Sequence, residues 1–249
     1  MGDSLQDRIA LVTGGSSGIG FAMAKRFIFE GAHVVITGRR AAELEAAVAD
    51  LGPKATGIRA DVASLSDLDL LYDQISTRFG RLDVLAANAG GGDMAALGEI
   101  SEKHFDDIFS VNVRGLLFTV QKALPLLRPG SSIILTGSTT SIEGTPAFSV
   151  YSASKAAVRN FARTWILDLR GKGIRLNVLS PGATKTPGLL GLAPAEQQQA
   201  MLDTFAEKIP LGRVGDPDEI GKVAVFLASD ASSFVTGIEL FADGGAAQI

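Results

Sequence analysis

The chain is organised around residues 132–171, which read SIILTGSTTSIEGTPAFSVYSASKAAVRNFARTWILDLRG. A short apolar run at 133–135 leads into a polar loop that contains glycine, which is how buried parallel strands end. After this loop the apolar residues recur at helical spacing. Tyr151 and Lys155 are four residues apart, so both side chains lie on one face of the predicted helix. Ser138 ends the preceding strand and can face the same place.

A phenol, an ammonium and a hydroxyl together have the chemistry of a proton-transfer site. Free tyrosine has a pKa of about 10, and a nearby lysine cation lowers that pKa because it favours the phenolate. A serine hydroxyl can hydrogen-bond a substrate oxygen. The Tyr-x-x-x-Lys spacing alone also fits two unrelated surface residues, because short motifs occur by chance. The choice between these interpretations depends on the rest of the chain.

Composition narrows the class of protein. The chain has 249 residues, of which 46% are hydrophobic, and it shows no linker or repeat, so we expect one α/β domain over residues 1–249. The net charge is −4 and no basic run exceeds Arg39-Arg40, which argues against nucleic-acid binding. There is no cysteine, so we expect no disulfide and no thiolate metal site, and because His33 and His104 stand alone, we expect no metal. Since no apolar run approaches ~18 residues, we expect no membrane span and a cytoplasmic location.

Short apolar runs alternate with helical patterns along the chain. The predicted strands are 9–13, 33–37, 54–59, 82–86, 133–137, 175–179 and 238–241. The predicted helices are 19–30, 41–51, 65–79, 101–127, 150–170 and 217–229. This alternation predicts a doubly wound, parallel, seven-stranded sheet with helices on both faces. Residues 182–210 interrupt the alternation, and we expect them to form a lid over the substrate, with hinges near Gly188 and Gly191.

The first strand ends in a glycine-rich turn, Thr13-Gly14-Gly15-Ser16-Ser17-Gly18-Ile19-Gly20, and a helix follows. Glycines allow a tight turn and let the backbone approach a pyrophosphate, while the helix N-terminus supplies amide donors and partial positive charge. The spacing predicts a dinucleotide site. A plain connection between strand and helix is the alternative.

The second strand ends in Gly38-Arg39-Arg40. In nicotinamide-binding α/β folds, an acidic residue at this point binds the free 2′-hydroxyl of NAD, and a cation accommodates the 2′-phosphate of NADP. Here the acid is absent and two arginines follow a glycine, which favours NADP(H). A solvated pair of cations at the start of a helix is the alternative interpretation.

Several further motifs occur in order along nearly the whole chain: Asp61-Val62, Asn88-Ala89-Gly90, Asn112, Ser138, Tyr151-x-x-x-Lys155 and Pro181-Gly182. With the glycine turn, they make the chain resemble the short-chain dehydrogenase/reductase family. The resemblance implies a Rossmann-type fold. One departure is Ala87, where the family usually has a second asparagine, and we expect little effect because Asn88 and Gly90 remain.

The resemblance also implies a set of site residues. The implied catalytic residues are Asn112, Ser138, Tyr151 and Lys155. The implied cofactor-binding residues are Gly14, Ser16, Ser17, Gly18, Ile19, Gly20, Arg39, Arg40, Asp61, Val62, Asn88, Ala89, Gly90, Tyr151, Lys155, Pro181, Gly182, Thr184 and Thr186. Tyr151 would be the acid in reduction, Lys155 would lower its pKa and bond the nicotinamide ribose, and Ser138 would polarise the carbonyl. Asn112 would kink its helix and hold a water that relays protons.

The leading functional hypothesis is an NADPH-dependent carbonyl reductase that acts on a medium-sized, partly apolar ketone. Its substrate wall would include Thr139, Thr140, Phe148, Leu189 and Leu190. A 3-oxoacyl–carrier-protein reductase is the first alternative, and it would need a basic docking patch.

Arg128 and Lys172 lie at predicted helix ends where such a patch could form, although both could equally be ordinary helix-end cations. An alcohol or sugar dehydrogenase that works in oxidation and a non-catalytic scaffold on the same fold are two further hypotheses. Apolar residues on more than one face of the helices at 101–127 and 150–170 predict a homotetramer, since the family commonly pairs these helices.

Overall fold

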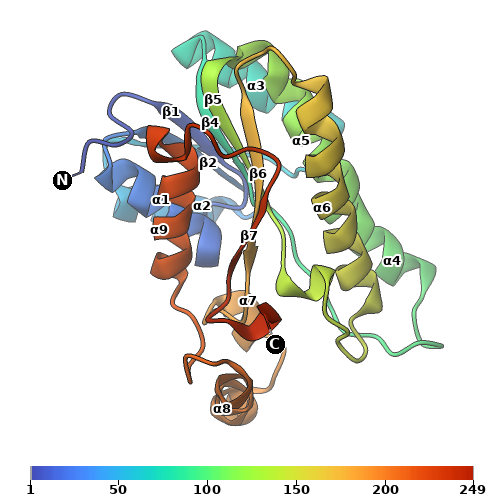
Figure 1. The fold of residues 1–249 in the computed structure, drawn as a ribbon. Coiled ribbons are helices and arrows are strands. Elements are labelled where there is room, and N and C mark those ends of the chain that lie inside the picture. The colour runs from blue at the N-terminus through green and yellow to red at the C-terminus, as the bar shows by residue number, and fades with distance from the viewer. Residues whose placement is uncertain (1, 249) are drawn as a thin grey trace.

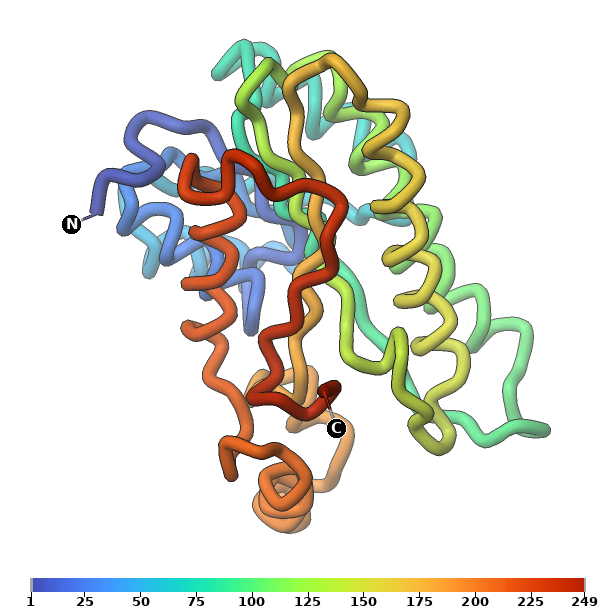
Figure 2. The backbone as a smooth tube through the Cα atoms, in the orientation of Figure 1, coloured from blue at the N-terminus to red at the C-terminus, as the bar shows by residue number. Residues whose placement is uncertain are grey.

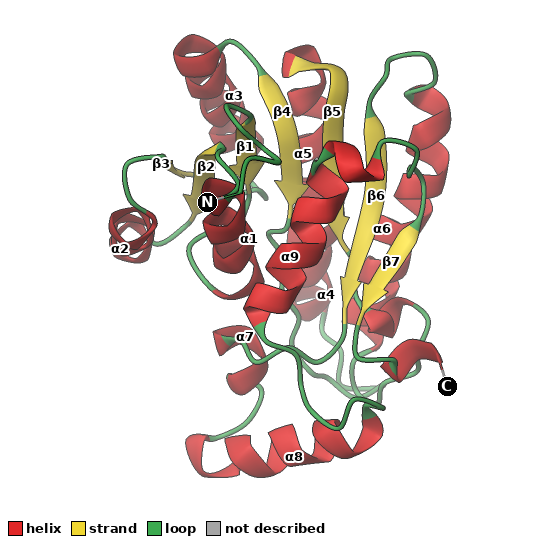
Figure 3. Ribbon diagram, turned by 60° about the vertical axis from the view of Figure 1, so that its left-hand side comes forward, coloured by secondary structure: helices red, strands yellow, loops and turns green. Residues whose placement is uncertain are grey.

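A parallel sheet of seven strands runs through the centre of the molecule (Figures 1 and 3). The computed structural model describes residues 2–248. The strands lie in the order β3-β2-β1-β4-β5-β6-β7. Their bounds are β1 Ile9–Val12, β2 His33–Gly38, β3 Ala55–Arg59, β4 Leu82–Ala87, β5 Leu127–Thr136, β6 Arg175–Pro181 and β7 Glu239–Ala242. The strand order reverses between β1 and β4, so the fold is a doubly wound Rossmann-type sheet, as predicted.

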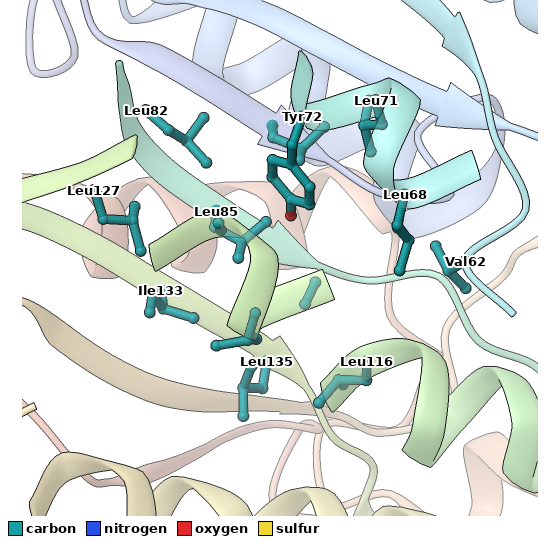
Figure 4. Close-up of a cluster of buried hydrophobic side chains, with 14 of the residues drawn as sticks. Val62, Leu68, Leu71, Tyr72, Leu82, Leu85, Leu116, Leu127, Ile133 and Leu135 are labelled. Atoms are coloured by element: carbon teal, nitrogen blue, oxygen red, sulfur yellow. The ribbon is translucent and has the colours of Figure 1, made fainter. Parts of the chain in front are cut away.

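Helices cover both faces of the sheet. On one face lie α1 (Gly18–Phe29), α2 (Ala41–Leu51) and α9 (Pro217–Ala228), and on the other lie α3 (Leu65–Phe79), α5 (Leu116–Ala123) and α6 (Ser149–Asp168) (Figure 1). Each face has its own apolar core. The core beneath α3 and α5 includes Leu68, Leu85 and Leu135 (Figure 4). The strands are apolar along both faces because both are covered.

The predicted helix at 101–127 is wrong as a single element. It divides into α4 (Glu102–Phe109), a π-helical segment (Ser110–Gly115), α5 and a short 3-10 turn (Leu124–Leu126), and β5 already begins at Leu127. A Cβ atom on Gly115 would lie 2.9 Å from the Val62 carbonyl oxygen, so the backbone packs closely there. Pro125 lies in the 3-10 turn, and its ring and missing amide end the helix.

Residues 182–210 lie below the carboxyl ends of the strands (Figure 2). The segment is mostly helical: it contains α7 (Pro187–Leu190), a 3-10 turn (Ala195–Gln197) and α8 (Gln198–Lys208). Gly188 lies inside α7 and Gly191 caps it, so the predicted hinges are helical positions. Among residues 2–248, no helix is long and apolar enough to cross a membrane.

Candidate functional site

Ser138, Tyr151 and Lys155 come together at the carboxyl edge of the sheet. Ser138 follows β5, and its hydroxyl accepts hydrogen bonds from the amide and hydroxyl of Thr140 at 3.2 and 3.0 Å. Tyr151 and Lys155 lie on the first turns of α6. The Lys155 ammonium lies 5.6 Å from the centre of the Tyr151 ring and donates to the Thr136 carbonyl at 2.8 Å. The three side chains that the sequence predicts as a proton-transfer group therefore lie close together.

The Tyr151 ring is enclosed by its neighbours. Phe148 stacks on it with ring centres 4.5 Å apart. A Cβ atom on Gly92 would lie 2.3 Å from the ring, so only glycine fits at that position without a shift. Burial raises the pKa of the Tyr151 phenol, and its hydrogen bond with Ser138 partly opposes that rise. The loop at 91–93 therefore packs closely against the ring of Tyr151.

Burial lowers the pKa of Lys155, whereas it raises the pKa of Tyr151. The lysine side chain is 3% exposed, and burial lowers the pKa of Lys155 to about 8, because a buried ammonium loses its hydration. A lysine with this pKa is still mostly charged at neutral pH. Its cation therefore remains available to favour the phenolate of Tyr151.

Asn112 lies in the π-helical segment and fixes the loop after β4. Its side-chain oxygen accepts from the Gly91 amide at 3.0 Å, and its amide group donates to the Gly91 carbonyl and the Ser154 hydroxyl, both at 2.9 Å. The side-chain carbonyl oxygen of Asn112 would also lie 3.0 Å from a Cβ atom on Gly90. Asn112 thus joins the β4 loop to α6. Ser154, which no sequence motif singles out, takes part in these contacts, and Thr136, which likewise has no motif, accepts from Lys155.

The glycine turn adopts a conformation that requires glycine. Gly14 and Gly18 have φ of 65° and 54°, and a Cβ atom on Gly20 would lie 2.2 Å from the Gly14 carbonyl oxygen. Within the described chain, the Ser17 side chain caps no amide, and the first turn of α1 contains no acidic residue. These amides can therefore receive an anion, and the turn fits a pyrophosphate. Ser16 and Ile19 belong to the same turn and helix start.

Asn88 joins the ends of three strands. Its side-chain amide donates to the Thr13 carbonyl at 3.0 Å, and its side-chain oxygen accepts from the Thr136 hydroxyl at 3.3 Å. The Thr13 hydroxyl in turn accepts from the amides of Asn88 and Ala89 at 3.0 Å. The backbone at residues 88–90 is thereby held against the glycine turn.

The ends of β2 and β3 place three arginines side by side. Arg39 and Arg40 are exposed, and Arg40 forms an ion pair with Glu43. Arg59, which is paired with Gly38 in the sheet, donates from Nε to the Arg39 carbonyl at 2.9 Å. The pairing of Arg40 leaves Arg39 as the better candidate to bind an anion here.

Two other predicted positions lie near this region. The Asp61 carboxylate accepts from the Ala63 amide at 2.9 Å. The Val62 side chain is buried in the core, so only its main chain is available to a ligand.

Residues after β6 approach the glycine turn from the other side. Pro181 ends β6, and Gly182 and Thr184 follow it. The Thr186 hydroxyl accepts from the Leu189 amide at 3.1 Å, and a Cβ atom on Gly18 would lie 3.4 Å from Thr186. Leu189 and Leu190 belong to α7, which begins directly after Thr186, whereas Thr139, Thr140 and Phe148 border Ser138 and Tyr151.

Arg128 and Lys172 do not belong to this region. Arg128 lies near the start of β5, and Lys172 lies just before β6. Both therefore lie at the amino ends of the strands, while Ser138 and Tyr151 lie at the opposite edge. A docking patch built from these two cations would not face the candidate site.

Comparison with known proteins gives a consistent assignment. A family model described as "Enoyl-(Acyl carrier protein) reductase" matches residues 14–247. Oxidoreductase asL5 of Sarocladium schorii is 50% identical over 247 residues, which cover 98% of each protein. Versicolorin reductase 1 of Dothistroma septosporum is 39% identical over 256 residues and 97% of each protein. The chain belongs to the short-chain dehydrogenase/reductase family.

A solved structure extends the similarity to three dimensions. The crystal structure of levodione reductase superimposes with a TM-score of 0.93 at 30% identity, covering 98% of this chain and 99% of that one. As a short-chain dehydrogenase/reductase, the chain is an oxidoreductase that uses a nicotinamide cofactor and acts on a small molecule.

Proposed function

We propose that this protein is an NADPH-dependent carbonyl reductase. The observation that carries the proposal is the enclosed group at the end of β5, where the Tyr151 phenol interacts with Ser138 and the Lys155 ammonium lies over the phenol ring. A protonated phenol next to a hydroxyl and a cation is suited to give a proton to a carbonyl oxygen and to tolerate the charge that remains.

The cofactor would lie along the carboxyl edge, between the glycine turn and Lys155. The uncapped amides at the start of α1 would bind its pyrophosphate, and Lys155 would bond its nicotinamide ribose. Arg39 would bind a 2′-phosphate through its planar guanidinium, which can hold two phosphate oxygens at once. Gly38 supplies no carboxylate that would repel that phosphate. These two features together support NADPH over NADH.

The bound cofactor supplies a hydride to the carbonyl carbon of the substrate. The Ser138 hydroxyl donates a hydrogen bond to the carbonyl oxygen and holds it beside the phenol. Tyr151 transfers its phenolic proton to that oxygen, which gives the alcohol. The Lys155 cation stabilises the phenolate left on Tyr151 until a proton from solvent restores the phenol. Asn112 supports this step by fixing the Gly91 backbone beside α6.

The substrate would be a partly apolar ketone of moderate size. Phe148 and the threonines after Ser138 would form one wall, and residues 182–210 would cover it as a lid. The names of versicolorin reductase and levodione reductase also describe reductases, which supports this direction. An acyl-carrier substrate is less favoured, because Arg128 and Lys172 lie at the opposite edge of the sheet.

A panel of substrates tests the proposal. Purified protein would be mixed with NADPH and, in turn, an aryl ketone, an aliphatic diketone and a 3-oxoacyl thioester, and separately with NADP and a sugar, and NADPH absorbance would be followed. We expect turnover on ketones and a lower kcat/KM on the thioester. Preference for the thioester would support a carrier-protein reductase, faster oxidation of the sugar would support a dehydrogenase, and no turnover would support a scaffold.

We predict a cytosolic homotetramer as the working form.

A further inference from the structure

A buried carboxylate in the edge strand β7 connects the two elements that carry Ser138 and Tyr151. The Glu239 side chain is 9% exposed. One of its oxygens accepts from the Ser141 hydroxyl at 2.9 Å and from the Ser180 hydroxyl at 2.7 Å. The other oxygen lies 2.6 Å from the Arg159 guanidinium. These partners compensate for the removal of a charge from water.

The serine partners lead to the Ser138 turn. Ser141 closes the 3-10 turn at 139–141, and its amide donates to the Ser138 carbonyl at 3.0 Å. Ser180 supports the residue before Ser138, because a Cβ atom on Gly137 would lie 2.2 Å from the Ser180 hydroxyl. The Glu239 carboxylate therefore holds this turn at two points.

The arginine partner leads to the helix that carries the phenol. Arg159 follows Lys155 by four residues, just as Lys155 follows Tyr151, so the three side chains form one stripe on α6. Arg159 is 32% exposed at its side chain, and its charge is balanced by Glu239. One carboxylate thus joins the strand end and the helix that meet at the candidate site.

We propose that Glu239 is a positioning residue, which sets the Ser138 hydroxyl and the Tyr151 phenol at the same substrate oxygen. The proposal rests on the proposed function, because it takes these two groups to be the ones that act on the carbonyl. Proton transfer requires both donors within hydrogen-bond reach of one atom. Glu239 does not touch that atom, and it acts only by fixing the distance between two separate elements.

Three variants separate positioning from a general effect on stability. Glu239→Gln keeps an oxygen that can accept from both serines but removes the charge that faces Arg159. Ser141→Ala removes only the link to the Ser138 turn. Asp83→Asn is the matched control: the Asp83 side chain is 13% exposed, accepts from the Ile9 amide at 2.8 Å and pairs with Arg81, at the amino edge of the sheet.

Two readouts are measured on each variant, together with its melting temperature. The first is kcat with NADPH and a ketone. The second is the pKa of the Tyr151 phenol, from near-ultraviolet titration of the cofactor-free protein. The chain has two tyrosines, and the other, Tyr72, is buried, which raises the pKa of its phenol. Burial raises the pKa of both phenols, but only at Tyr151 does a hydrogen bond oppose that rise, so we expect Tyr151 to ionise first.

We expect Glu239→Gln and Ser141→Ala to lower kcat by about ten- to a hundred-fold, as small displacements of reacting groups do, and to leave NADPH affinity unchanged. Both should raise the Tyr151 pKa, because the hydrogen bond from Ser138 that lowers it is weakened. Asp83→Asn should change neither readout. Wild-type kcat and phenol pKa in both variants, or equal losses in Asp83→Asn, would overturn the proposal. If the wild type reduces no ketone, the proposed function fails, and the phenol titration still decides whether Glu239 positions the turn.

Discussion

The Lys155 ammonium is buried at the site, although a charged group is more stable in water. Its pKa is lowered to about 8. Between about pH 8 and about pH 10.4, Lys155 is protonated in the unfolded chain but largely neutral in the folded one. The free energy of unfolding therefore rises with pH across this window, and below about pH 8 it is lower by the full cost of burying the charge. We expect Lys155→Met to abolish turnover and to raise the free energy of unfolding by about 1–3 kcal/mol near neutral pH.

Urea unfolding at two pH values checks this expectation. The stability advantage of Lys155→Met should shrink as pH rises from about 8 toward 10. Lys25→Met is the control, because Lys25 is exposed on α1 and should show no such pH dependence. If Lys155→Met were less stable than the wild type at neutral pH, burial of the Lys155 ammonium would not reduce stability as we expect.

Arg39 and Gly38 should decide the choice of cofactor. A charge-assisted hydrogen bond contributes about 1.5–3 kcal/mol, which corresponds to roughly a ten- to hundred-fold preference. We expect Gly38→Asp combined with Arg39→Ala to reverse the preference for NADPH, mostly through KM for the cofactor. A Cβ atom at Gly38 would lie 3.0 Å from the Ser16 hydroxyl, which can rotate away.

Arg40→Ala is the control for this change, because Arg40 already pairs with Glu43. It should reduce the preference far less than Arg39→Ala. The preference should also weaken at high salt, since part of it is Coulombic. Equal kcat/KM for NADH and NADPH in the wild type at low ionic strength would exclude the assigned role of Arg39.

Side chains with a distinctive chemistry can be predicted from the sequence, whereas main-chain and long-range partners cannot. The grouping of Ser138, Tyr151 and Lys155 follows from helical spacing and from the end of a strand. The hydrogen bond from Lys155 to the Thr136 carbonyl has no signal in the sequence, because every residue carries a carbonyl. The contact between Glu239 and Arg159 joins positions far apart in the chain, and only the fold brings them together.

At the scale of elements, the glycine turn is the part that tolerates least change. An added Cβ atom at Gly20 would meet backbone, at 2.2 Å from the Gly14 carbonyl oxygen, so no side-chain rotation can relieve the clash. We expect Gly20→Ala to displace the turn, at a cost of about 1–3 kcal/mol in stability, and to weaken NADPH binding. Calorimetry and NADPH fluorescence measure the two effects. Gly144→Ala is the control, since nothing lies within 4 Å of its Cβ position; equal effects in both variants would refute the expectation.

Helices α3 and α9 begin after recognisable capping residues and lie where the sequence predicts them. The helices α2 and α3 have the predicted bounds, and the Ser64 hydroxyl accepts from the Asp67 amide at the start of α3. Asp216 and Glu219 form a capping box at the start of α9. The π-helical segment lies at Asn112, where the family resemblance implies a kink, and the Gly91 backbone bonds the Asn112 side chain there.

At the scale of the whole molecule, apolar side chains remain exposed on helices that flank the site. Phe105 and Leu167 are 44% and 59% exposed, and Phe105 stacks on Phe109. Exposed apolar surface of this kind favours association between copies. We expect a homotetramer by light scattering at micromolar concentration. Phe105→Glu combined with Leu167→Glu should produce smaller species, whereas Leu70→Glu, on exposed α3 surface, should not. A monomeric wild type would contradict this prediction.

The whole fold follows from the alternation of strands and helices, because parallel strands need covered crossovers. The seven strands predicted from apolar runs are the seven strands of the sheet. Residues 182–210 interrupt the predicted alternation, and the structure shows that they contain α7 and α8. α7 has only four residues and α8 buries only Leu202, so neither helix shows a clear apolar stripe in the sequence.

Replacing Tyr151 by phenylalanine tests the proposed proton donor most directly. The variant keeps the ring that stacks on Phe148 and removes only the hydroxyl that interacts with Ser138. The measurement is kcat for reduction of the best ketone with NADPH, alongside the NADPH dissociation constant. We predict unchanged NADPH affinity and a kcat reduced by at least about a hundred-fold, the usual contribution of a general acid. A Tyr151→Phe protein that binds NADPH and keeps kcat near the wild-type value would show that another group donates the proton.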